Sequence, residues 1–217
     1  MNNLSRYFLL CIFSLSTLSI YAQNSAEQAK TILDKVSTFY KAQKSIDTEF
    51  SLNIINEDAD INETQKGSLQ VKGEKYKITS DELIRVSDGY SIWTHFIEDE
   101  EVQITEFDPE ENELTPAKIF TIYEEGFRQE YVGQTDLGGN TFEKVILHPT
   151  DPDNPYEKIG LFINPQTHLI TKANVYSKNG SLIVYKIFNT SFSKDLEDEM
   201  FNYNVSKLDD IEVIDLR

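Results

Sequence analysis

The chain has 217 residues, of which 39% are hydrophobic and 12% aromatic, with only 9 Gly and 6 Pro. This composition is typical of a globular domain and excludes a disordered or collagen-like chain. The 20 basic residues are outnumbered by 37 acidic ones, so the formal net charge is −17. Such a surface repels phosphate backbones and anionic lipid headgroups. We therefore expect no nucleic acid partner, only transient membrane contact, and a dispersed monomer.

The N-terminus has the features of a secretory signal peptide over residues 1–22, followed by a single domain over residues 23–217. Residues 7–20 form an apolar run that is too short to span a bilayer, and Ala22 is a small residue suited to cleavage. Cys11 lies inside this run after large residues, which argues against a lipid anchor. The mature chain is therefore predicted to be exported and to lack cysteine.

An amphipathic helix is predicted directly after the signal peptide. Ser25 to Gln28 has the spacing of a capping box, and the helix is expected to end near Ala42. Its apolar residues recur at intervals of three and four, which predicts one buried face. These residues are Ala29, Ile32, Leu33, Val36, Phe39 and Tyr40.

Alternation of apolar and polar residues predicts eleven strands. Short connections between them favour antiparallel pairing, and Asp88-Gly89 is a hairpin signal. The expected strands lie near residues 46–54, 66–72, 76–78, 84–86, 90–97, 102–104, 127–135, 141–149, 157–164, 169–177 and 182–192.

Thr115-Pro116 marks the start of a second, short helix over residues 116–125. An antiparallel sheet of about eleven strands must curl or close, and a barrel of this size leaves interior volume. We therefore predict a mainly β (α+β) fold. It is an unclosed, strongly curved antiparallel β-barrel of about eleven strands, with helices as a plug or lid on the concave side.

No constellation of catalytic or metal-binding residues stands out, and no G-x-S-x-G elbow is present. The histidines lie on or beside predicted strands without a second ligand at metal spacing; they are His95, His148 and His168. The Asp151–Pro155 loop has carboxylates that suit calcium but lacks the glycine and glutamate of an EF-hand, so a rigid acidic loop is favoured. The chain is therefore predicted to be no enzyme and to need no cofactor or metal.

Two acidic hairpin tips, Glu98–Glu101 and Asp108–Glu113, are interpreted as solvated turns, with docking on a basic partner surface as the alternative. Trp93, the only tryptophan, lies on a predicted strand. Trp93 is equally well interpreted as a core residue or as a residue that lines a pocket.

Val86-Ser-Asp-Gly89 followed by Trp93 resembles a hairpin of the LolA family of periplasmic lipoprotein carriers. The resemblance extends over residues 25–217 and includes the helix after the signal peptide. It also includes Ser45–Phe50, Gly67–Leu69 with Val71-Lys72, Asp198–Tyr203 and Ile214–Arg217, the last two being similar to the endings of Bacteroidetes-type members.

This resemblance implies an unclosed eleven-stranded barrel whose helices form a lid over an apolar cavity. It implies a carrier that accepts triacylated lipoproteins from an inner-membrane ABC transporter, crosses the periplasm, and delivers them to an outer-membrane acceptor. Gly73 stands where many relatives have an Arg that latches the lid, and Ile78 stands where an aromatic residue is frequent. Lid closure is therefore expected to depend on apolar contact alone.

The acyl-chain cavity is predicted from strand residues whose neighbours are polar, together with the tryptophan. Its lining is expected to be Phe50, Leu52, Leu69, Val71, Ile78, Ile84, Trp93 and Ile104. Ile119, Ile122 and Tyr123 are expected to face it from the lid helix. Three alternatives remain open: a carrier of another amphiphile, a lipid-sensing regulatory module on the same half-barrel, and an unrecognised enzyme.

Overall fold

The computed structural model describes residues 25–108 and 118–217. The predicted signal peptide, Cys11 and the start of the predicted second helix lie outside the described residues. Within the described part, no helix is both long and apolar enough to cross a membrane.

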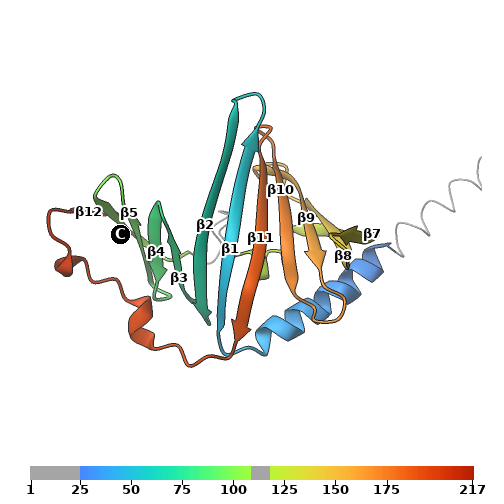
Figure 1. Ribbon diagram of the computed structural model, residues 1–217, viewed down its shortest axis with the longest axis horizontal. Coiled ribbons are helices and arrows are strands. Elements are labelled where there is room, and N and C mark those ends of the chain that lie inside the picture. Colours follow the sequence, from blue (N-terminus) through green and yellow to red (C-terminus); the bar gives the residue numbers. More distant parts are fainter. Residues whose placement is uncertain (1–24, 109–117) are drawn as a thin grey trace, which may run out of the picture.

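The strands form one twelve-stranded sheet, which is shown in Figure 1. Its order is β12-β6-β5-β4-β3-β2-β1-β11-β10-β9-β8-β7, so β12 and β7 are its two edges and the sheet is not closed. The strands are β1 (Ile46–Asn56), β2 (Ile61–Lys72), β3 (Lys75–Ser80), β4 (Leu83–Ser87), β5 (Ser91–Phe96), β6 (Glu101–Glu106), β7 (Phe127–Leu137), β8 (Asn140–Pro149), β9 (Tyr156–Ile163), β10 (Ile170–Ser177), β11 (Leu182–Phe192) and β12 (Glu212–Asp215).

All eleven predicted strands are present and pair in antiparallel fashion, which confirms the predicted fold class. The twelfth strand, β12, was not predicted, and it pairs with β6 in parallel. A four-residue edge strand such as Glu212–Asp215 is too short to show alternation, so the sequence carries little signal for it.

The predicted first helix is present over residues 25–41. Figure 1 shows it lying obliquely beside β8, β9 and β10. Ala29, Leu33, Val36 and Tyr40 form its buried face and join the main hydrophobic cluster. The face of the sheet that contacts this helix is called the concave face below, and the opposite face the convex face.

The predicted second helix over residues 116–125 is wrong. Lys118–Phe120 forms a single 3₁₀ turn, and residues 121–126 continue as turns and bends. Gly126 has a φ of 78° and Phe127 already begins β7, so few residues are left for a helix. The β-branched side chains of Ile119, Thr121 and Ile122 also disfavour helix. Residues 118–124 are called the cover segment below.

Residues 193–217, called the C-terminal arm below, pack on the convex face of β3 to β6. The arm contains the 3₁₀ turns η2 (Asp198–Phe201) and η3 (Val205–Lys207) and ends in β12. η2 contacts β3, and the Tyr203 hydroxyl lies 2.6 Å from His95 Nδ1 on β5. Figure 1 shows the arm running from the lower end of β11 to the opposite edge of the sheet from β7.

Candidate functional site: the covered concave face

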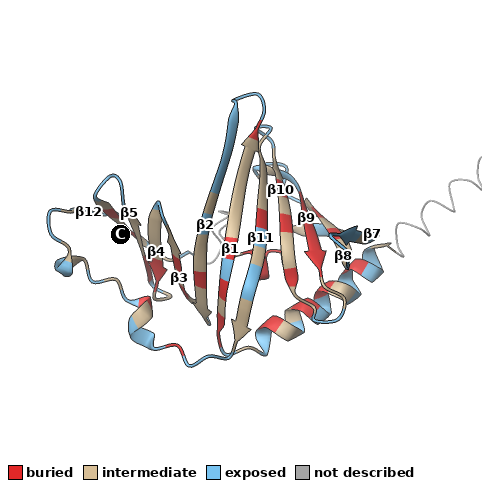
Figure 2. Cartoon of the chain, viewed as in Figure 1, coloured by how far each residue is buried: buried red, intermediate tan, exposed pale blue. Residues whose placement is uncertain are grey.

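The concave face is an apolar wall. Figure 2 shows buried stretches on most strands, and the alternation of the strands places the buried residues on one face. Phe50 on β1 lies opposite Gly67 on β2, where an added Cβ would lie 2.7 Å from the Phe50 ring. The fully buried members of the wall come from β8, β9 and β10; they are Val145, Leu147, Ile159, Leu161, Ile163, Ala173 and Val175.

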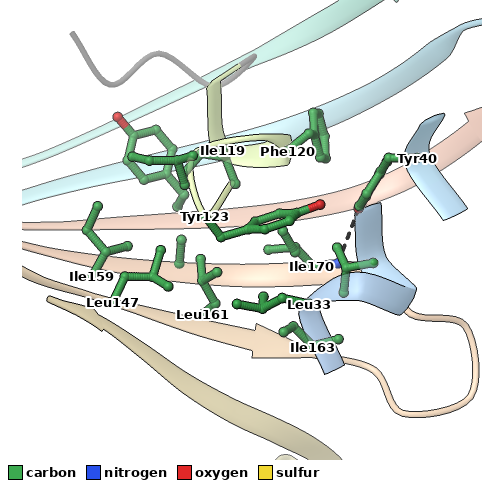
Figure 3. Packing of buried hydrophobic residues seen from close by; sticks show 14 of the residues in the cluster. Leu33, Tyr40, Ile119, Phe120, Tyr123, Leu147, Ile159, Leu161, Ile163 and Ile170 are labelled. Atoms are coloured by element: carbon green, nitrogen blue, oxygen red, sulfur yellow. Dashed lines mark hydrogen bonds between the residues drawn. The ribbon is translucent and has the colours of Figure 1, made fainter. Parts of the chain in front are cut away.

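This wall is covered by chain segments that do not belong to the sheet. Figure 3 shows Ile119, Phe120 and Tyr123 of the cover segment facing the strand residues. Leu33 and Tyr40 approach the same strands from the helix, and the Tyr40 hydroxyl accepts a hydrogen bond of 3.2 Å from the Ile170 backbone N–H. The concave core is therefore completed by the helix and the cover segment rather than by closure of the barrel.

A pocket of about 440 Å³ remains where the cover is incomplete. It lies within the 300–1,000 Å³ range that is usual for small-molecule sites. Its apolar lining includes Ile46, Val71, Tyr76, Ile92, Phe107 and Phe120. Its charged lining is Lys41, Lys44, Glu74, Arg85, Asp108, Lys118 and Glu124. The pocket thus combines an apolar wall with both signs of charge, which suits an amphiphilic ligand.

Polar contacts tie the cover segment to the helix through Glu124. Lys41 Nζ lies 2.8 Å from a Glu124 carboxylate oxygen, and the Ser37 hydroxyl donates to the same oxygen at 2.8 Å. Gln129 of β7 donates to the Tyr123 carbonyl at 2.9 Å. The expectation that closure depends on apolar contact alone is therefore wrong, although a partly exposed ion pair adds only about 0–1 kcal/mol.

The hydroxyl groups of Tyr40 and Tyr123 lie where the helix and the cover segment meet the sheet. Burial raises the pKa of Tyr40 well above its usual value, and its hydrogen bond from Ile170 offsets part of this rise. Burial also raises the pKa of Tyr123. The Tyr123 hydroxyl has no partner at hydrogen-bond distance among the described residues, although Ser37 lies close enough to lower its pKa slightly. Both phenols therefore stay neutral at physiological pH.

Five of the predicted cavity residues lie on the concave face. Phe50, Leu69 and Ile78 are buried in the main cluster, and Leu52 and Val71 pack against it; Val71 also lines the pocket. From the cover segment, Ile119, Ile122 and Tyr123 are buried in the same cluster.

The other three predicted cavity residues lie on the convex face, so their assignment to the cavity is wrong. Leu83 packs against the main cluster and Arg85 lines the pocket, which turns the intervening Ile84 to the convex face. Trp93 pairs with Val86 and with Ile104, so all three share that face. The sequence pattern could not reveal this, because strands β4 to β6 bury apolar residues on both faces.

Gly73 lies at the pocket rim, in the two-residue turn between β2 and β3. Its φ is +62°, and positive φ at the first central position is what a type II′ hairpin turn requires. The glycine at the predicted latch position is therefore explained by turn geometry. An Arg at this position would place its side chain on a strained backbone.

The remaining candidates have structural roles. His148 Nε2 lies 2.8 Å from a Glu130 carboxylate oxygen. Within 151–155, Asp151 accepts the Asp153 backbone N–H at 2.9 Å, as expected of a rigid loop. No group of three or more potential metal ligands occurs in the part of the chain that the structure describes.

Sequence analysis missed several pocket residues. Arg85, Ile92 and Phe107 line the pocket, and so do Tyr40 and Lys41 from the end of the helix. Ile92 was hidden by its position next to Trp93, because consecutive apolar residues on a strand point to opposite faces. Phe107 follows the last residue of β6 and carries no periodic signal.

An unclosed antiparallel half-barrel with a covered apolar concave face defines a binding scaffold. The family of outer membrane lipoprotein carrier proteins known as LolA matches residues 41–204. The chain therefore belongs to the LolA family, which is a family of carriers and not of enzymes. The resemblance inferred from the sequence is confirmed at the level of the family.

One solved structure shows the same fold at low sequence identity, and two further solved structures are similar to the chain. An uncharacterized conserved protein from Thermus thermophilus is 11% identical with a TM-score of 0.55, covering 87% of this chain and 99% of that one. A DUF1329 family protein from Desulfovibrio piger is 14% identical with a TM-score of 0.49, covering 83% and 99%. A LolA superfamily protein from Nitrosomonas europaea is 15% identical with a TM-score of 0.41, covering 81% and 97%. No curated protein matches the chain.

Proposed function

We propose that the chain is a periplasmic carrier that shields the acyl chains of lipoproteins on its concave face. The observation that carries this proposal is the origin of the cover. The apolar wall is buried by a helix and a short segment that are joined to the sheet by connecting residues. Such a cover can be exchanged for a ligand without breaking the hydrogen bonds of the sheet.

The energetics of this exchange are nearly balanced. Moving Ile119, Phe120, Ile122 and Tyr123 into water costs roughly 6–12 kcal/mol, taking about 1.5–3 kcal/mol for each side chain. An acyl chain of about fifteen methylenes recovers roughly 12 kcal/mol on leaving water, at about 0.8 kcal/mol for each methylene. One chain therefore offsets displacement of the cover segment, and cargo is held without being trapped.

The direction of transport follows from the proposed role. Triacylated lipoproteins enter from an inner-membrane lipoprotein-releasing ABC transporter, and an outer-membrane acceptor receives them. Export through a signal peptide over residues 1–22 and a single carrier domain over residues 23–217 belong to the same proposal. The carrier itself needs no catalysis and no cofactor, because shielding an acyl chain is a matter of apolar contact.

Native mass spectrometry of the protein isolated from its own periplasm tests this function. We expect a co-purified acylated protein, and its loss when the acceptor cysteine of a co-expressed model lipoprotein is replaced by serine. A free lipid in its place would indicate a carrier of another amphiphile. A bound protein without acyl groups would indicate a regulatory module. Either result would contradict the lipoprotein carrier.

A further inference from the structure

A row of lysines crosses the convex face in register. Lys66 on β2 pairs with Ser51 on β1, and Ser51 pairs with Lys186 on β11. Lys186 pairs with Lys172 on β10. Phe162 on β9 pairs with Lys172 on one side and with Lys144 on β8 on the other. Residues that pair directly share one face of a sheet, so these four lysines form one line, called the lysine row below.

The row spans six adjacent strands. Neighbouring strands lie about 4.8 Å apart, so the row is about 24 Å long. Phe162, which is 5% exposed, lies between Lys172 and Lys144 in the row. The ammonium groups of Lys144 and Lys172 lie 5.6 and 5.0 Å from the Phe162 ring centroid. Their alkyl stems therefore cover the ring while their charges face solvent.

The row has no acidic partner. None of the four lysines forms an ion pair with a described residue, and Lys172 and Lys186 are placed directly opposite each other. Like charges in that position destabilise a sheet. Acidic residues on the same face lie outside the row: Glu49 pairs with Phe188, and Glu130 pairs with Ile146 near the start of β7. The whole chain has a net charge of −17, so a row of four lysines without acidic partners differs from the acidic character of the rest of the chain.

The chemistry of the row favours lipid headgroups over a protein. Lysine is depleted in protein–protein interfaces, whereas a lysine near an anionic bilayer binds its surface charge without needing a fixed partner geometry. Phe188 lies two residues from Lys186 on the same strand face and is 39% exposed. An exposed aromatic ring beside lysines is typical of surfaces that contact the bilayer interface. The C-terminal arm contacts β1 and β2 at one end, through Asp47 and Lys72. Lys66 and Lys186 are exposed, so the row is open to solvent.

We propose that the lysine row is a docking surface for anionic phospholipid headgroups, which orients the carrier during its transient contact with a membrane. The net negative charge of the chain opposes binding in any other orientation. The row thereby explains how an acidic carrier approaches an anionic surface with its concave face turned away from the headgroups.

The test is flotation with vesicles of phosphatidylcholine alone or with 40% phosphatidylglycerol, at about 0.1 M salt. The test variant is Lys144→Gln/Lys172→Gln/Lys186→Gln. The matched control is Lys30→Gln/Lys35→Gln/Lys207→Gln, which changes the net charge equally at three exposed lysines elsewhere. Each lysine near an anionic surface contributes about fivefold, so the test variant should bind roughly a hundredfold more weakly and the control within about threefold of wild type.

Equal losses in both variants would show that only net charge matters and would overturn the proposal. Equal binding of the wild-type protein to both kinds of vesicle would overturn it too. So would a test variant that binds vesicles like wild type but no longer binds an acidic protein that wild type and the control both capture. Binding of a fluorescent fatty acid by the same three proteins separates this result from the carrier function. None of the substituted lysines lines the pocket, so acyl binding should be unchanged.

Discussion

The two halves of the sheet are stabilised from opposite sides. In the half formed by β7 to β11, called the packed half, the concave face packs against the helix and the cover segment, and the convex face is open. In the half formed by β3 to β6 and β12, called the pocket half, the C-terminal arm covers the convex face and the concave face lines the pocket. Buried residues outside the main cluster mark this second layer, including Val86, Val102, Leu196 and Phe201.

The difference shows how a sheet can keep a pocket without collapsing into it. Four short strands with an uncovered apolar face would lose much of their burial, and they would be free to bend. The arm restores burial from behind through Phe201, which is 0% exposed. Arg217 ties the end of the arm to β5 by donating to the Ser91 hydroxyl at 3.1 Å. The pocket half can therefore leave its concave side partly empty.

The largest effect is expected where the arm contacts the pocket half. Phe201→Ala should destabilise the protein by about 3–5 kcal/mol, because it removes a fully buried ring from the convex layer. Urea unfolding followed by circular dichroism measures this change. Met200→Ala, at a half-buried neighbour in η2, is the control and should cost much less. Equal costs for the two variants would show that the arm does not brace the sheet.

A second comparison separates packing from pocket lining. Leu161→Ala in the packed half should cost about 2–5 kcal/mol, because Leu161 is 0% exposed and its surroundings are close-packed. Val71→Ala at the half-buried pocket wall should cost about 1 kcal/mol or less. Affinity for a fluorescent fatty acid should fall more in Val71→Ala than in Leu161→Ala. If Leu161→Ala weakens that affinity more than Val71→Ala does, the assignment of the pocket is wrong.

The same contrast explains what the sequence could predict. The packed half has one wet and one buried face, so alternation such as that of Val145 and Leu147 gives both the strands and their inward residues. In the pocket half both faces are buried. Val86 is buried on the convex face, outside the main cluster. Alternation cannot distinguish apolar residues that face the arm from apolar residues that face a cavity.

The cover segment and β12 were the other limits of prediction. The apolar residues at 119, 120, 122 and 123 have helical spacing, but burial against the sheet in a 3₁₀ turn satisfies the same spacing. The parallel pairing of β12 with β6 joins residues more than 100 positions apart, for example Val213 and Val102. No local pattern encodes such a long-range contact.

A third prediction concerns the cover segment. Ile122→Asp should place a charge among buried apolar residues and displace the segment, so that a labelled lipoprotein is released at least about tenfold faster. Thr121→Asp is the matched control, because it adds the same charge one residue away, at an exposed position. Release to outer-membrane vesicles is the measurement. Indistinguishable release from the two variants would show that the segment does not act as a lid.

The smallest effect is expected from the ion pairs that hold the arm to the sheet. Asp198 Oδ1 lies 2.9 Å from Lys72 Nζ and Oδ2 lies 3.4 Å from Lys75 Nζ, and both lysines belong to the convex side of the β2–β3 hairpin. The hydrogen bond and charge of Lys72 hold the pKa of Asp198 below its usual value. The same contact raises the pKa of Lys72. Asp198 is exposed and both lysine side chains are partly exposed, so solvent screens the interaction.

The signs of these shifts define where the pair stabilises the fold. A carboxylate with a lowered folded-state pKa contributes its stability above its unfolded pKa of about 3.9 and loses it as the pH falls through the folded value. A lysine with a raised folded-state pKa contributes below about 10.4 and loses its contribution as the pH rises through its folded value. The contribution of the pair should therefore be constant between about pH 5 and pH 9 and disappear at more acidic pH.

Asp198→Asn should consequently lower the urea midpoint slightly at pH 7 and no longer at pH 2, and added salt should reduce the difference at pH 7. Trp93 reports this region, because it is the only tryptophan and shares the convex face with His95, the partner of Tyr203 in the arm. Its emission should shift toward that of a solvated indole if the arm loosens. Asp209→Asn, at an exposed aspartate of the same arm, is the control. If the urea midpoints of Asp198→Asn and wild type differ by the same amount at every pH from 7 down to 2, these ion pairs do not hold the arm in place.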